Sequence, residues 1–90
     1  MKISSLEATV PYMLSPNYKD RFYAEYHQLR LRLQKLNTFL DAYRKGDLPF
    51  KPTCSIIELE EQAVLMDKYL KLLKLRAKKE KVNLWKIATS

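Results

Sequence analysis

The residues that most often carry out catalysis are scarce in this chain. It contains one histidine and one cysteine, His27 and Cys54, which could form a nucleophilic pair only if they met. The helix predicted between them would hold the two side chains roughly 27 Å apart. No second histidine completes a metal site, and no glycine-rich phosphate loop is present. We therefore expect neither an enzyme nor a cofactor or metal. We interpret His27 as a surface helix residue and Cys54 as structurally incidental.

Basic residues offer a binding chemistry instead. The chain has 17 Lys and Arg against 10 Asp and Glu, a net charge of +7, which favours an anionic partner such as a nucleic acid, a nucleotide or an acidic protein surface. Five lysines recur at the spacing of a helix face: Lys68, Lys71, Lys74, Lys78 and Lys81. They form either a solvated polar face or a face that contacts phosphates without reading bases. Arg76 differs because it borders an apolar stripe, where an arginine either extends into solvent or pairs with an anion at an interface.

Aromatic residues gather at the same end of the predicted structure as many of these cations. They are Tyr12, Tyr18, Phe22, Tyr23, Tyr26 and Trp85. Rings beside cations can hold nucleobases by stacking. Phe22 and Tyr26 also belong to the predicted core. Tyr12, Tyr18 and Trp85 lie outside it and are the better candidates, with ordinary packing as the alternative role.

Two heptad repeats of apolar residues predict the elements that must position these side chains. The first repeat consists of Phe22, Tyr26, Leu29, Leu33, Leu36, Leu40 and Tyr43. The second consists of Leu59, Ala63, Met66, Leu70, Leu73 and Ala77. Such repeats are typical of helices that pack knobs-into-holes, and a short connection makes neighbouring helices antiparallel. The predicted fold class is all-α, an antiparallel hairpin of two long helices with an N-terminal arm.

Caps and breakers indicate where the predicted helices begin and end. Ser15 and Pro16 favour a helix start, and Gly46 favours a stop. Ser55 and Glu58 match a capping box, which marks a second start. The predicted segments are a docked arm over 1–14 and a hairpin over 15–88, made of a helix over about 16–45, a loop over 46–54 and a helix over about 55–85.

The second predicted helix has more apolar surface than one seam needs. Leu65, Tyr69 and Leu72 form a second stripe beside the seam, and Leu31 and Phe39 are surplus on the first helix. Left exposed, these residues would make a large apolar patch. We favour self-association into a helical homo-oligomer. The alternative is that the N-terminal arm folds back and covers the patch.

The stretch from Tyr18 to Arg76 resembles a family of very small helical-hairpin proteins from bacteriophages and prophages, named after a crAss-like phage protein. The matching positions are Arg21, Glu25, Leu29, Lys35, Leu36, Phe39, Leu59, Gln62, Met66, Tyr69, Leu73 and Arg76. The connection departs from the family pattern, because residues 49–52 are less acidic than expected.

In size and topology the predicted hairpin also resembles the phage anti-CBASS sponges. That resemblance implies a compact homo-oligomer, usually a hexamer, which sequesters cyclic oligonucleotide messengers without cleaving them. It also implies that an aromatic residue near the start of the first long helix stacks on a base while basic residues hold phosphates. The ligand-binding counterparts in this chain would be Tyr12, Tyr18, Lys19, Arg21 and Arg76.

The leading hypothesis is a phage-encoded, non-enzymatic protein that sequesters a cyclic di- or trinucleotide in the host bacterial cytoplasm and so blocks immune signalling. The runner-up is a basic nucleic-acid-binding accessory protein that uses the lysine face. The third is a structural or adaptor helical bundle without a ligand. A membrane partner is not expected, because no apolar run is long enough to cross a bilayer and the first residues lack the apolar block of a signal peptide.

Overall fold

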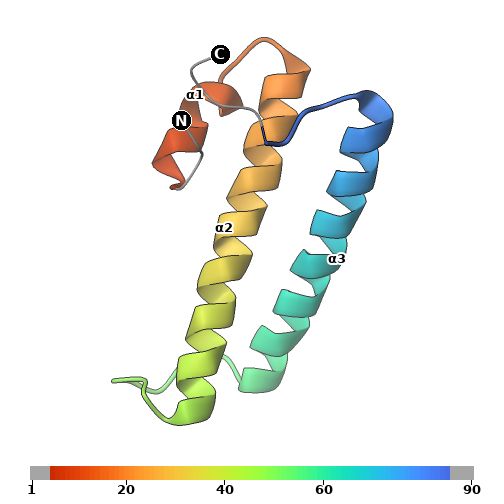
Figure 1. Cartoon of the computed structure of the whole chain (residues 1–90). Helices are drawn as coiled ribbons and strands as arrows, with labels where there is room; N and C mark the ends of the chain where they lie inside the picture. The colour runs from red at the N-terminus through yellow and green to blue at the C-terminus, as the bar shows by residue number, and fades with distance from the viewer. Residues whose placement is uncertain (1–4, 86–90) are drawn as a thin grey trace.

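The protein is a hairpin of two long antiparallel helices with a short helical arm. The computed structural model describes residues 5–85. In that range the order is η1 Glu7–Thr9, α1 Val10–Met13, α2 Tyr18–Lys45 and α3 Ile56–Glu80. Figure 1 shows α2 and α3 side by side, joined at one end by the loop. The all-α hairpin predicted from the heptads is thereby confirmed. Residues 1–4 of the predicted arm and 86–88 of the predicted hairpin lie outside the described residues.

Helix α2 begins at Tyr18, later than the start near residue 16 that was expected from Ser15 and Pro16. The cap is Asn17, whose side chain accepts a hydrogen bond from the backbone N–H of Lys19 at 2.9 Å. Ser15 instead donates its hydroxyl to Asp20 at 2.8 Å. The C-terminal end matches the expectation, because Gly46 adopts the left-handed conformation with φ 74°, which glycine reaches without steric cost.

Helix α3 begins with the predicted cap but ends earlier than predicted. The Ser55 hydroxyl accepts from the backbone N–H of Glu58 at 3.2 Å and lies 3.1 Å from the Glu58 carboxylate, to which it donates. The prediction that α3 continues to about residue 85 is wrong, since the helix ends at Glu80. Lys81 takes the left-handed conformation with φ 59°, and the chain turns back towards α2.

The core lies between the two seams. Its buried members are Phe22, Tyr26, Leu33, Leu70, Leu73, Ala77 and Leu84. All but Leu84 belong to the predicted heptads, and Leu73 is fully buried. Leu84 reaches the core because the chain reverses after Lys81. No helix within residues 5–85 combines the length and apolar character that a bilayer crossing requires.

The arm packs on α2, on the side away from α3 (Figure 1). Tyr23 and Leu31 of α2 are buried there against Leu6, Ala8 and Tyr12. The arm therefore covers Leu31, one of the two surplus apolar residues of α2. The other, Phe39, lies instead beside Phe50 of the loop, with ring centroids 6.1 Å apart. It leaves the second stripe of α3 exposed, with 65% of Leu65, 43% of Tyr69 and 53% of Leu72 accessible to solvent. The alternative prediction, in which the arm covers the whole apolar patch, is therefore wrong for this stripe.

Candidate functional site

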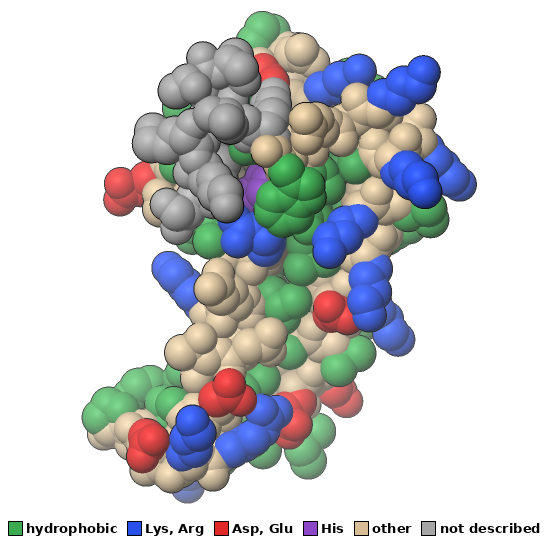
Figure 2. Space-filling model, viewed as in Figure 1, with side chains coloured by type: hydrophobic (Ala, Val, Ile, Leu, Met, Phe, Trp, Pro, Cys, Tyr) green, Lys and Arg blue, Asp and Glu red, His purple; other side chains and the backbone are tan. Residues whose placement is uncertain are grey.

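Cations concentrate at the end of the hairpin where α2 begins and α3 ends. The last turn of α3 carries Lys78 and Lys79, and Lys81 follows it, all exposed. In Figure 2 many Lys and Arg side chains lie along the right side of the molecule, with others near the middle and left of the view, whereas acidic and basic side chains mix at the loop end. A small anion would therefore be attracted to the upper end.

Arg76 lies across the two helices at this end. Its guanidinium carbon is 4.9 Å from the centroid of the Phe22 ring, within cation–π range. Its Nε donates to the Glu80 carboxylate at 3.0 Å. The side chain is 48% exposed. Arg76 is thus held by partners within the chain, an arrangement that neither of the two alternatives drawn from the sequence included. A guanidinium has five N–H donors, and Glu80 takes the one on Nε.

Two other predicted residues share a helix face with Phe22. Tyr18, Arg21 and Phe22 follow at the i, i+3 and i+4 spacing that places side chains together. Tyr18 is 48% exposed, and Arg21 donates from Nη1 to the backbone carbonyl of Ser15 at 2.8 Å. One turn further along, Glu25 accepts a hydrogen bond from the Tyr69 hydroxyl of α3. We call this the Arg76 edge; its members are Tyr18, Arg21, Phe22, Glu25, Tyr69, Arg76 and Glu80.

The remaining predicted ligand residues lie elsewhere. Tyr12 belongs to the arm and packs edge-on against Tyr23, with ring centroids 5.0 Å apart, on the side of α2 away from α3. Lys19 follows Tyr18 directly, so it points about 100° further around the helix. Helical spacing therefore places Tyr18 and Arg21 on the side of α2 that carries Phe22, the ring that Arg76 contacts, whereas Tyr12 and Lys19 lie elsewhere.

The interpretation of His27 as a surface residue is wrong. Its side chain is only 2% exposed. Nε2 donates to the backbone carbonyl of Leu84, and Nδ1 accepts from Nε of Arg30 at 3.1 Å. These two bonds require the neutral ring with its proton on Nε2. The sequence could not reveal this role, because residue 27 lies off the heptad seam and its partner comes from the chain reversal after α3.

Burial, followed by the charge of Arg30, lowers the pKa of His27 from its ordinary value of 6.5, against the opposing effect of the Leu84 hydrogen bond. The unfolded chain takes up the proton more readily than the folded one. The stabilising contribution of neutral His27 is therefore complete above about pH 6.5 and is lost as the pH falls through the lowered value. Thermal unfolding should show a midpoint that falls between pH 7.5 and 5.

The matched control is His27→Gln, because the glutamine amide can still donate to a carbonyl but does not titrate. The difference between the two unfolding profiles isolates the histidine from the carboxylates. Equal pH slopes for both proteins would contradict this role of His27.

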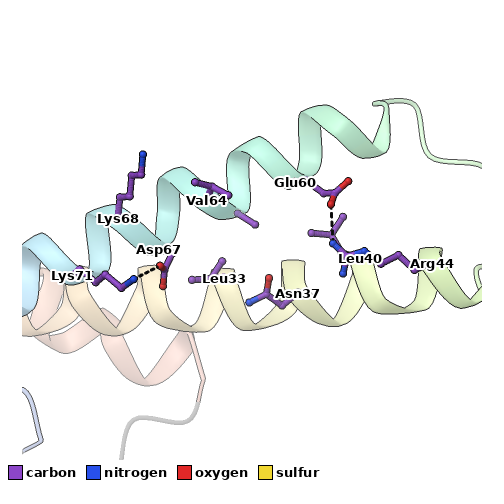
Figure 3. Close-up of a pocket in the computed structure, with 10 residues that line it drawn as sticks. Leu33, Asn37, Leu40, Arg44, Glu60, Val64, Asp67, Lys68 and Lys71 are labelled. Carbon is purple, nitrogen blue, oxygen red and sulfur yellow. Dashed lines mark hydrogen bonds and ion pairs between the residues drawn. The ribbon is translucent and has the colours of Figure 1, made fainter.

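A groove nearer the loop is a poorer anion site. It lies between α2 and α3, and Figure 3 shows side chains from both helices lining it. Arg44 pairs there with Glu60 at 3.1 Å, and Lys71 pairs with Asp67 at 2.9 Å. These carboxylates already pair with two of the three cations that line the groove, the third being Lys68, so little net positive charge remains to attract a phosphate.

The fold is that of a small, basic helical hairpin with an N-terminal arm. Comparison with protein families gives a specific assignment: the model of the Sequestin family matches residues 16–79. The chain belongs to that family, whose name indicates proteins that bind and sequester a ligand. Comparisons with curated proteins and with solved structures gave no match.

Proposed function

We propose that the protein sequesters a small anionic nucleotide, a cyclic di- or trinucleotide, and that a phage uses it to block bacterial immune signalling. The observation that carries this proposal is Arg76, a half-exposed guanidinium held over the Phe22 ring at the basic end of the hairpin. Family membership supports sequestration. The class of ligand follows from the pairing of exposed rings with cations.

The Arg76 edge supplies two kinds of contact. The terminal nitrogens of Arg76 and the guanidinium of Arg21 can donate to phosphate oxygens. Tyr18, half exposed on the same face of α2, can stack on a base. Because Glu80 and Phe22 already hold Arg76 in place, less rotamer freedom is lost on binding. Sequestration requires only this binding and no bond cleavage.

Arg76→Ala should weaken the binding of a cyclic dinucleotide by roughly ten- to hundredfold, since a hydrogen bond to a charged group contributes about 1.5–3 kcal/mol. Calorimetry with a panel of cyclic di- and trinucleotides measures the effect. Lys78→Ala is the matched control, because it also removes one cation from the last part of α3 but leaves the Arg76 edge intact. No heat with any cyclic nucleotide would refute the proposed ligand class.

The second candidate is a nucleic-acid-binding protein. The exposed row Lys68, Lys71, Lys74 and Lys78 on α3 favours it. Duplex DNA should then bind with a salt slope near −0.9 per phosphate contacted. Loss of binding in Lys71→Ala and Lys78→Ala, with Arg76→Ala unchanged, would select this function. A chain that binds neither ligand would be the third candidate, a structural bundle.

We also propose that the sequestering form is a homo-oligomer. The stripe of Leu65, Tyr69 and Leu72 is about half exposed or more in the single chain. Burying each leucine fully would contribute about 1.5–3 kcal/mol relative to exposure. Tyr69 also belongs to the Arg76 edge through Glu25, so a second copy placed on the stripe would lie beside the binding residues. A hexamer is the size implied by the resemblance to sponges.

A further inference from the structure

The segment that follows α3 brings an exposed tryptophan to the other edge of the hairpin. Trp85 is 65% exposed, although it lies at the basic end of the protein and directly after the buried Leu84. Its ring contacts Tyr26 and His27 of α2. It contributes nothing to the Arg76 edge described above.

Two backbone contacts and two ring contacts hold Trp85 in a defined position. The Leu84 carbonyl accepts from buried His27, which fixes the backbone next to Trp85. The backbone N–H of Trp85 donates to the Asn83 side chain at 3.0 Å. The ring lies edge-on to Tyr26 at 5.9 Å and to His27 at 5.4 Å between centroids. The ring is thus both preorganised and accessible, a combination that lowers the entropic cost of binding.

A cation lies beside the same ring. The guanidinium carbon of Arg30 is 6.0 Å from the Trp85 centroid, and Arg30 is anchored by donating from Nε to Nδ1 of His27. His27 is neutral in this arrangement, so Arg30 supplies the local charge. An exposed ring next to an oriented guanidinium is the pairing that holds a base by stacking and its phosphate by charge.

We propose that Trp85 and Arg30 form a second nucleotide site, in which Trp85 stacks on a nucleobase and Arg30 contacts the attached phosphate. The site takes the same ligand class as the proposed function and rests on it for that class, but it uses none of the residues of the Arg76 edge. A ligand with two bases could engage both kinds of site when copies of the chain assemble.

Trp85 is the single tryptophan of the chain, so its fluorescence reports on this site alone. Adenosine monophosphate and a cyclic di-adenosine nucleotide should each quench the emission saturably. Ribose 5-phosphate, which has the phosphate but no base, should not. Arg30→Gln should shift the quenching curve to about tenfold higher nucleotide concentration, since it removes one charge-assisted contact. Circular dichroism would verify that this variant remains folded.

Calorimetry supplies a second measurement that does not depend on the fluorophore. Trp85→Leu should weaken nucleotide binding by about five- to hundredfold, the range for loss of one base-stacking ring. Unchanged emission at nucleotide concentrations that saturate the calorimetric signal, or equal quenching by ribose 5-phosphate, would overturn the second site and leave the Arg76 edge standing. Saturable quenching by adenosine monophosphate with no response to any cyclic nucleotide would instead support the site and refute the proposed function.

Discussion

Leu72→Glu should convert the assembled protein into folded monomers. The side chain is 53% exposed in the single chain, so the hairpin itself tolerates a carboxylate there. In a homo-oligomer built on the stripe of Leu65, Tyr69 and Leu72, each copy would have to bury an unpaired charge, which costs several kcal/mol. Sedimentation at micromolar concentration should show an oligomer for the natural protein and a monomer for the variant, with unchanged circular dichroism.

The matched control is Lys74→Glu. Residue 74 is two positions along α3, and so points about 200° away around the helix, and its side chain is exposed. The Lys74→Glu variant should remain an oligomer, which would show that the position of the negative charge, and not the charge alone, causes dissociation. A natural protein that sediments as a monomer would rule out the proposed assembly.

Leu73→Ala, at the residue directly after Leu72, should instead destabilise the hairpin itself. Leu73 is 0% exposed at the centre of the seam. Truncation of a buried leucine to alanine costs about 2–5 kcal/mol, which combines lost burial with the cavity left behind. For a domain of this size that is a large part of the total stability. Chemical denaturation should show a lower midpoint with little change in slope.

This measurement is cleanest in the Leu72→Glu background, because dissociation then contributes nothing to the unfolding free energy. Leu75→Ala is the control in the same background, since that leucine is 50% exposed. Its truncation should lower the free energy of unfolding by about 0.5 kcal/mol or less. Equal destabilisation by the two truncations would contradict the assignment of Leu73 to the core.

The heptad periodicity predicted the part of the fold that depends on residues close together in the sequence. The seam positions Leu33, Leu70 and Leu73 are buried as expected, because a heptad repeat places them on one stripe whatever the rest of the chain does. The end of α3 was not predictable in this way. Lys81 turns the chain in the left-handed conformation without the glycine or asparagine that usually signals such a turn.

The candidate site likewise has one part that the sequence predicts and another that it does not. The grouping of Tyr18, Arg21 and Phe22 follows from helical spacing within α2 alone. The i,i+4 pair of Arg76 with Glu80 was also available in the sequence as a spacing pattern. The location of Tyr12 and the burial of His27 depend on how the arm and the segment after α3 dock. Those contacts join parts of the chain that share no repeat, so no local pattern encodes them.

The return of the chain to α2 after Lys81 has a consequence for the order in which the protein folds. The hydrogen bond between His27 and Leu84 spans 57 residues, and Leu84 completes the core. Because a contact between residues so far apart in the sequence closes late in folding, we expect the His27–Leu84 contact to form only after α2 and α3 have paired. Until then the hairpin would expose the apolar surface that Leu84 later covers, which is the kind of surface that makes folding intermediates prone to aggregate.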